Sequence, residues 1–112
     1  MNIRLVLLQR LTAALMVPLI IGHLAVIFYA SHKGLAAADI LSRTKGSIGW
    51  ALFYGVFVVA ASVHGAIGVR TVASEWTPRS VSCNTRALDF FMWAFGLGLA
   101  FLGLRAVAAV VL

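Results

Sequence analysis

The sequence contains few of the residues that cover or cross-link a water-soluble domain. Charged residues make up only 11% of its 112 positions, with three Asp and Glu in all, whereas soluble domains carry about 25%. A single cysteine, Cys83, excludes a disulfide within the chain and a cysteine-based zinc module. The hydrophobic content of 62% excludes a disordered segment. This composition predicts a membrane protein.

Long stretches without charge predict three membrane-spanning helices. Residues 11–30 and 46–69 contain no Asp, Glu, Lys or Arg, and about 20 such residues cross a hydrocarbon core of about 30 Å. A third stretch, residues 88–112, begins beside Asp89, and Arg105 near its end can extend its side chain to the headgroups. We therefore predict an all-α transmembrane fold in one domain over residues 1–112. Its helices are expected at about 5–30, 46–72 and 87–111, joined by short basic loops at 31–45 and 70–87.

The first stretch has two features that need an explanation. Pro18 removes one backbone hydrogen bond, so we expect a kink there. Arg4 before an apolar run is also typical of a cleaved signal peptide. We favour a membrane helix because Arg10 interrupts the run, the run is too long, and the small residues of 34–38 follow only after a basic pair.

The basic residues that flank the spans predict the orientation. One face has Arg4, Arg10, Arg70, Arg79 and Arg86, and the other has Lys33, Arg43 and Lys45. The positive-inside bias places the N-terminus in the cytoplasm, and we expect a bacterial inner membrane, or the equivalent matrix side in a eukaryote. This topology accounts for the net charge of +6, so we expect no nucleic-acid partner.

His64 is the polar residue within the spans that most needs an explanation, because an ionisable group there is costly unless it is paired, coordinated or hydrated. It precedes Arg70 by six residues, about 9 Å of helix, and so lies below the headgroups. Its helical neighbours are small, namely Ala60, Ala61, Gly65 and Gly68. Either these residues allow close helix packing around a hydrogen-bonded histidine, or His64 ligates a haem iron and they make room for the porphyrin.

Other polar residues gather toward the predicted cytoplasmic end. Arg70 can pair with a haem propionate, and it serves equally well as a positive-inside anchor. Four residues there have different polar groups: a cation on Arg10, a hydroxyl on Thr12, a carboxylate on Glu75 and an indole on Trp76. Each alone is explained as an anchor or a cap, but together they favour a site for a small amphiphile with carbonyl oxygens, such as a quinone.

His23 lies elsewhere. It follows Arg10 by 13 residues, about 20 Å of helix, so it cannot ligate the same haem as His64 within this chain. We favour a packed, hydrogen-bonded His23, with ligation of a second haem on the outer side as the alternative.

The segment from His64 to Trp76 resembles the second membrane helix of the anchor subunits of succinate dehydrogenase and fumarate reductase (complex II). In that family a haem-ligating His is followed by Gly four residues later, and an Asp and an aromatic residue begin at the eleventh position. Here Gly68, Glu75 and Trp76 stand at those places. Residues 9–13, Gln-Arg-Leu-Thr-Ala, resemble the Arg-x-Ser/Thr-small motif that opens the first helix.

The resemblance implies a three-helix membrane anchor that packs with a second anchor chain, with His64 as an axial ligand of haem b and Arg10 near both quinone and propionate. It places Glu75 and Trp76 at the Asp-Tyr position of the family, whose tyrosine hydrogen-bonds a quinone carbonyl. Three departures stand out: Trp76 is only a donor, Val6 replaces a typical Ser, and the extended N-terminal segment of the larger anchor is absent. The resemblance leaves open which anchor this is, and we favour the smaller.

The implied function is docking of a flavoprotein and an iron–sulfur subunit for succinate:quinone electron transport in the respiratory chain and tricarboxylic acid cycle. The chain alone would perform no chemistry. A transporter would need a carboxylate within a span, and only Asp89, at the start of the third, comes close. A structural or assembly subunit of another respiratory complex, without haem or quinone, is the main alternative. The sequence leaves open the direction of the reaction, the kind of quinone and the number of haems.

Overall fold

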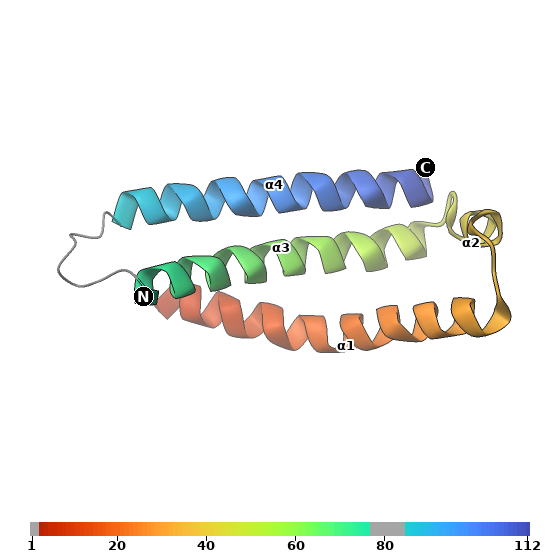
Figure 1. Ribbon diagram of the computed structural model, residues 1–112, viewed down its shortest axis with the longest axis horizontal. Helices are drawn as coiled ribbons and strands as arrows, with labels where there is room; N and C mark the ends of the chain where they lie inside the picture. The colour runs from red at the N-terminus through yellow and green to blue at the C-terminus, as the bar shows by residue number, and fades with distance from the viewer. Residues whose placement is uncertain (1–2, 77–84) are drawn as a thin grey trace.

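The structure, a computed structural model, describes residues 3–76 and 85–112 and consists there of helices only. The helices are α1 (Ile3–Lys33), α2 (Ala37–Thr44), α3 (Ile48–Trp76) and α4 (Thr85–Val111). The three long helices are each long and apolar enough to cross a membrane, and they run side by side in a bundle of 55 × 22 × 22 Å (Figure 1). The prediction of an all-α, three-span integral membrane protein is therefore confirmed.

Helix α3 lies between α1 and α4 and packs antiparallel against both (Figure 1). Small residues bring α3 and α4 together: a Cβ atom built on Gly96 would lie 3.1 Å from the Cβ of Ala66. Near this contact, Ile67 and Met92 are buried, and Leu5 of α1 packs against them. Small residues at helix contacts are typical of membrane bundles, because apolar side chains gain little by leaving lipid for protein.

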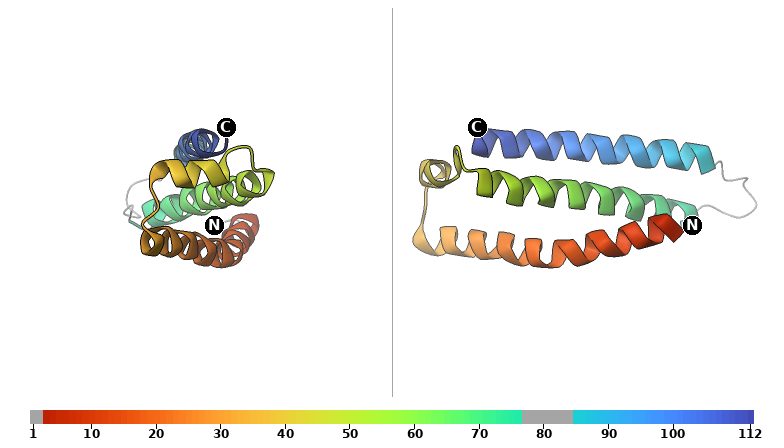
Figure 2. Two further views of the ribbon diagram at one scale, coloured as in Figure 1. Left: turned by 90° about the vertical axis from the view of Figure 1, so that its right-hand side faces the viewer. Right: turned by 180° about the vertical axis from the view of Figure 1, so that it is seen from behind.

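The first helix passes Pro18 without a break. Proline has no backbone N–H to donate to the preceding turn, which weakens the helix locally and favours bending. Figure 2 shows α1 bowed along its length, with its N-terminal end turned toward α3. The kink expected at Pro18 is thus accommodated within one continuous helix.

The segment 31–45, predicted as a loop, contains the short helix α2, and this part of the prediction is wrong. Gly34 ends α1 with a φ of 63°, which favours glycine, and its N–H donates to the carbonyl of Ser31. Asp39 then accepts a hydrogen bond from the N–H of Ala36 at 3.0 Å and caps α2. Figure 2 shows α2 crossing the end of the bundle, so this segment covers the ends of the long helices.

The connection from α2 to α3 holds the last turn of α4. The N–H of Gly46 donates to the carbonyl of Val111 at 2.6 Å, and the buried Thr44 hydroxyl donates to the carbonyl of Val110 at 2.9 Å. These carbonyls lack partners within their own helix, so the contacts satisfy them and fix the far end of α4. The second predicted loop includes Arg79 and Cys83, which lie outside the described residues.

Candidate functional site

His64 of α3 contacts Thr12 of α1. The antiparallel packing aligns the two helices in reverse order: Gln9 with Gly68, Thr12 with His64 and Gly22 with Phe53. The Thr12 hydroxyl oxygen lies 3.3 Å from Nδ1 of His64, and Thr12 is only 7% exposed. The contact is therefore an interhelical hydrogen bond away from bulk solvent.

The direction of this hydrogen bond follows from the other partners of Thr12. Its hydroxyl also lies 2.9 Å from the carbonyl oxygen of Leu8 and 3.0 Å from that of Gln9. A hydroxyl has one proton, and these carbonyls can only accept, so the proton of Thr12 is directed to α1. The arrangement that matches this is the tautomer with the ring proton on Nδ1, in which the hydroxyl oxygen accepts from Nδ1–H of His64 and the lone pair of the ring is on Nε2.

The Nε2 atom of His64 makes no hydrogen bond within the part of the chain that the structure describes. A neutral imidazole whose Nδ1–H is held by an acceptor and whose Nε2 is available is the usual form of a metal-ligating histidine. Residues 3–76 and 85–112 contain no group of three or more His, Cys, Asp or Glu side chains that could hold a metal ion. Among the described residues His64 therefore fits a metal whose remaining ligands come from another group or chain.

The small residues beside His64 are used in helix packing within the chain. A Cβ atom on Gly68 would lie 3.4 Å from Nε2 of Gln9, and one on Gly65 would lie 3.7 Å from Leu99. The Oε1 atom of Gln9 is buried and has no hydrogen-bond partner among the described residues. These contacts support the close-packing interpretation for Gly65 and Gly68, and they leave one orphaned polar atom a single turn from His64.

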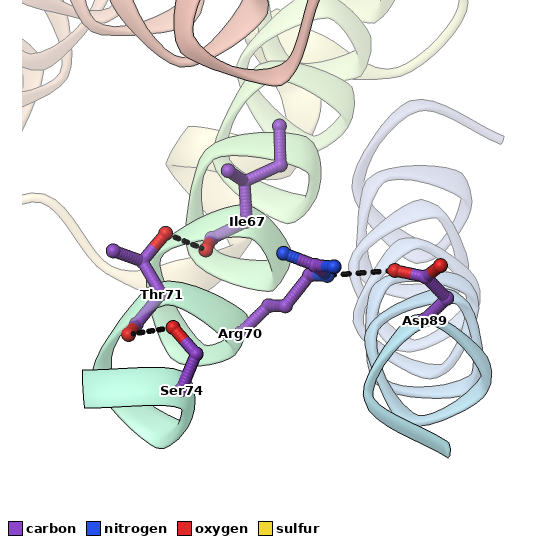
Figure 3. A network of polar contacts seen from close by, with 5 residues as sticks. All are labelled: Ile67, Arg70, Thr71, Ser74 and Asp89. Atoms are coloured by element: carbon purple, nitrogen blue, oxygen red, sulfur yellow. Dashed lines mark hydrogen bonds and ion pairs between the residues drawn. The ribbon is translucent and has the colours of Figure 1, made fainter. Parts of the chain in front are cut away.

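Arg70 forms an ion pair that the sequence analysis did not predict. Figure 3 shows its side chain extending from α3 to Asp89 on α4, and Nε donates to Oδ1 at 2.7 Å. The Arg70 side chain is 13% exposed and that of Asp89 is 50% exposed. Arg70 therefore faces α4, whereas His64 contacts α1. The signal that could have found the pair is the antiparallel register, which sets the start of α4 opposite the end of α3.

The predicted quinone residues are not all brought together. Thr12 lies against His64, whereas Arg10, Glu75 and Trp76 are exposed, Trp76 at 83%. Gln9 of α1 lies against Gly68 of α3. Trp76 follows Gly68 by eight residues, so it lies about 12 Å beyond this contact by helix rise. Glu75 and Trp76 therefore lie nearer the end of the helix bundle than Thr12 does.

His23 lies toward the opposite end of the bundle from Arg70. Its ring contacts those of Tyr54 and Phe57, at centroid distances of 5.8 and 5.4 Å. It lines a largely apolar cavity of about 680 Å³ that reaches Arg43 of α2. The predicted packing is observed, but Nδ1 of His23 is buried without a hydrogen-bond partner among the described residues.

The comparison with known protein families agrees with this architecture. The family described as succinate dehydrogenase/fumarate reductase transmembrane subunit matches residues 3–104, which covers α1, α2, α3 and most of α4. No curated protein and no solved structure matches the chain. Three apolar antiparallel helices and a match over nearly the whole sequence lead to one conclusion: the chain belongs to the family of succinate dehydrogenase/fumarate reductase transmembrane subunits.

Proposed function

We propose that the chain anchors a succinate:quinone oxidoreductase in the membrane. In this proposal it docks the flavoprotein and iron–sulfur subunits on the side of the N-terminus, which is cytoplasmic in a bacterial inner membrane, and packs with a second anchor chain. Family membership supports the role of anchor. Large apolar side chains exposed on every long helix, such as Phe28, Leu52 and Phe90, provide surface for lipid and for a second anchor.

We further infer that His64 is an axial ligand of haem b, and one observation carries this inference. The Thr12 hydroxyl oxygen lies 3.3 Å from Nδ1 of His64, and with the ring proton on Nδ1 the lone pair on Nε2 is left for iron. The haem, when bound, supplies a one-electron redox centre. His23 contacts Tyr54 and Phe57, seven to ten residues before His64 on α3 and about 10–15 Å away along the helix, so it cannot bind the same iron. In this proposal a second ligand would come from the partner anchor.

The arginines have different parts in this proposal. The Nε–H of Arg70 is taken by Asp89, but the guanidinium keeps further N–H donors that can bind a haem propionate. Arg10 is exposed one turn or less from Thr12 and offers its charge to a quinone or propionate. Asp89 keeps Arg70 extended toward α4, and the remaining N–H donors of Arg70 would be the ones to hold a propionate.

The quinone site is proposed at the same end of the bundle, built from Arg10, Glu75 and Trp76 with residues of the partner chains. Trp76 donates a single N–H to a carbonyl oxygen, and Glu75 can carry a proton. Thr12 is buried against His64, so we assign it to the haem side of the site. A docked iron–sulfur subunit at this face would deliver electrons to the quinone without a crossing of the bilayer.

A purely structural subunit remains a second candidate function because the small residues near His64 already have packing partners, such as Gln9 against Gly68. In that case His64 would serve only as a hydrogen-bond donor between α1 and α3. The two functions differ in whether the complex contains a b-type haem that depends on His64.

Replacement of His64 by Leu in the purified complex tests the proposal. We expect the reduced-minus-oxidised b-type spectrum to be lost or shifted while the subunits still copurify, because Leu cannot ligate iron. His23→Leu is the matched control, and its haem content and spectrum should equal those of the wild type. An unchanged spectrum and haem stoichiometry in His64→Leu would refute the assignment of His64 and favour the structural subunit.

A further inference from the structure

The hydrogen bond between Thr12 and His64 has a defined direction and a protected setting. The hydroxyl proton of Thr12 is directed to the carbonyls of Leu8 and Gln9 at 2.9 and 3.0 Å, both closer than His64 at 3.3 Å. Thr12 is only 7% exposed, so water has little access to Nδ1 of His64 and cannot easily replace the hydroxyl as its partner. Thr12 is therefore a fixed acceptor, built into one helix and aimed at a histidine of another.

The opposite direction would have a different chemical result. If the hydroxyl donated to Nδ1, the ring proton would move to Nε2, and Nε2 would have no lone pair for iron. The two α1 carbonyls compete with Nδ1 for the only proton that Thr12 has, and both lie closer to the hydroxyl than Nδ1 does. The backbone of α1 thus favours the Nδ1–H tautomer of His64 on α3.

We propose that Thr12 is a positioning residue for the haem ligand, which holds the His64 ring in the Nε2-ligating tautomer and lowers the reduction potential of the bound haem. This inference rests on the proposed ligation of iron by His64. An acceptor on Nδ1–H raises the electron density on Nε2 and makes the imidazole a more basic ligand. A more basic ligand stabilises ferric over ferrous iron, so the potential falls.

Two replacements of Thr12 separate the hydroxyl from its side-chain volume. Thr12→Val keeps the shape but has no acceptor, and Thr12→Ser keeps the acceptor. Thr71→Val is the matched control, because Thr71 also donates to a carbonyl one turn back, that of Ile67 at 2.9 Å, and it lies two turns from His64. The readout is the midpoint potential of the b-type absorption in the purified complex.

For Thr12→Val we expect a more positive midpoint potential of the haem, because one hydrogen bond to the ligand is lost. At the midpoint potential of the wild type, the ratio of oxidised to reduced haem should be about three- to tenfold lower in this variant. For a one-electron couple this is a shift of about 30–60 mV. Thr12→Ser and Thr71→Val should stay close to the wild type. Loss of haem in Thr12→Val with retention in Thr12→Ser would also support the proposal, since Ser keeps the hydroxyl acceptor and Val does not.

An unchanged potential in Thr12→Val, or an equal shift in Thr12→Ser, would overturn the role of the hydroxyl. Neither result would affect ligation by His64, because the spectrum of His64→Leu tests that separately. Conversely, a wild-type spectrum in His64→Leu would remove the proposed ligand, and a potential shift in Thr12→Val would then have to arise in another way.

Discussion

Loss of the Asp89 carboxylate should destabilise the contact between α3 and α4 by a moderate amount. In Asp89→Asn, the guanidinium of Arg70 stays largely buried, at 13% exposure, opposite a neutral amide. Breaking a fully buried pair costs about 3–5 kcal/mol, and exposed pairs are worth about 0.2–1 kcal/mol. Asp89 is 50% exposed and partly screened by solvent, so we expect about 1–2 kcal/mol in the free energy of unfolding.

A double-mutant cycle isolates this pair from other effects of the substitutions. Arg70→Met removes the charge and keeps most of the side-chain length, and the double variant should be less destabilised than the sum of the two single variants. The assay is denaturant unfolding of the purified complex in detergent, followed by the loss of helical signal. Arg105→Met, at an exposed position of α4, controls for loss of an arginine. Additivity within about 0.3–0.5 kcal/mol would refute a stabilising ion pair.

Two further predictions concern packing and quinone reduction. In Gly103→Ala the new Cβ would overlap the side chain of Val58, so we expect about 1–3 kcal/mol of destabilisation in the same assay; Gly98→Ala, with open space around it, should be neutral or stabilising. Equal effects would mean that α4 does not pack as described. Arg10→Ala should depress succinate-driven quinone reduction strongly but leave succinate-driven reduction of a soluble dye near wild type. Equal loss in both assays would show that Arg10 holds the assembly together.

The membrane spans could be predicted from the sequence because each is long and free of charge, and this signal does not depend on neighbouring helices. The short helix α2 was not predicted, because its eight residues make only about two helical turns, and an amphipathic pattern of that length is shorter than the stretch over which a helix is recognised. It is specified by local contacts instead, such as the cap that Asp39 provides on the N–H of Ala36. Such caps depend on a backbone geometry that composition does not report.

The candidate site could be predicted in its residue types but less well in its pairings. His64 was identified because a histidine within a span needs a partner, and the structure supplies Thr12 as that partner. Thr12 and Arg70 were expected at a quinone and a propionate, but their contacts within the chain are with His64 and Asp89. Pairings of this kind depend on the register between helices, and a difference of one turn exchanges the partners.

The polar contacts at both ends of α4 limit how the long helices can move along one another. Asp89 binds Arg70 at one end, and Val111 accepts from Gly46 at the other, so α3 and α4 cannot slide past each other without losing a polar contact at each end. Between α1 and α3, Thr12 and His64 form one of the polar contacts. An axial displacement of α1 against α3 and α4 would therefore strain the hydrogen bond at the His64 ring, so that a docked neighbour that shifts α1 acts on a histidine in the interior of the anchor.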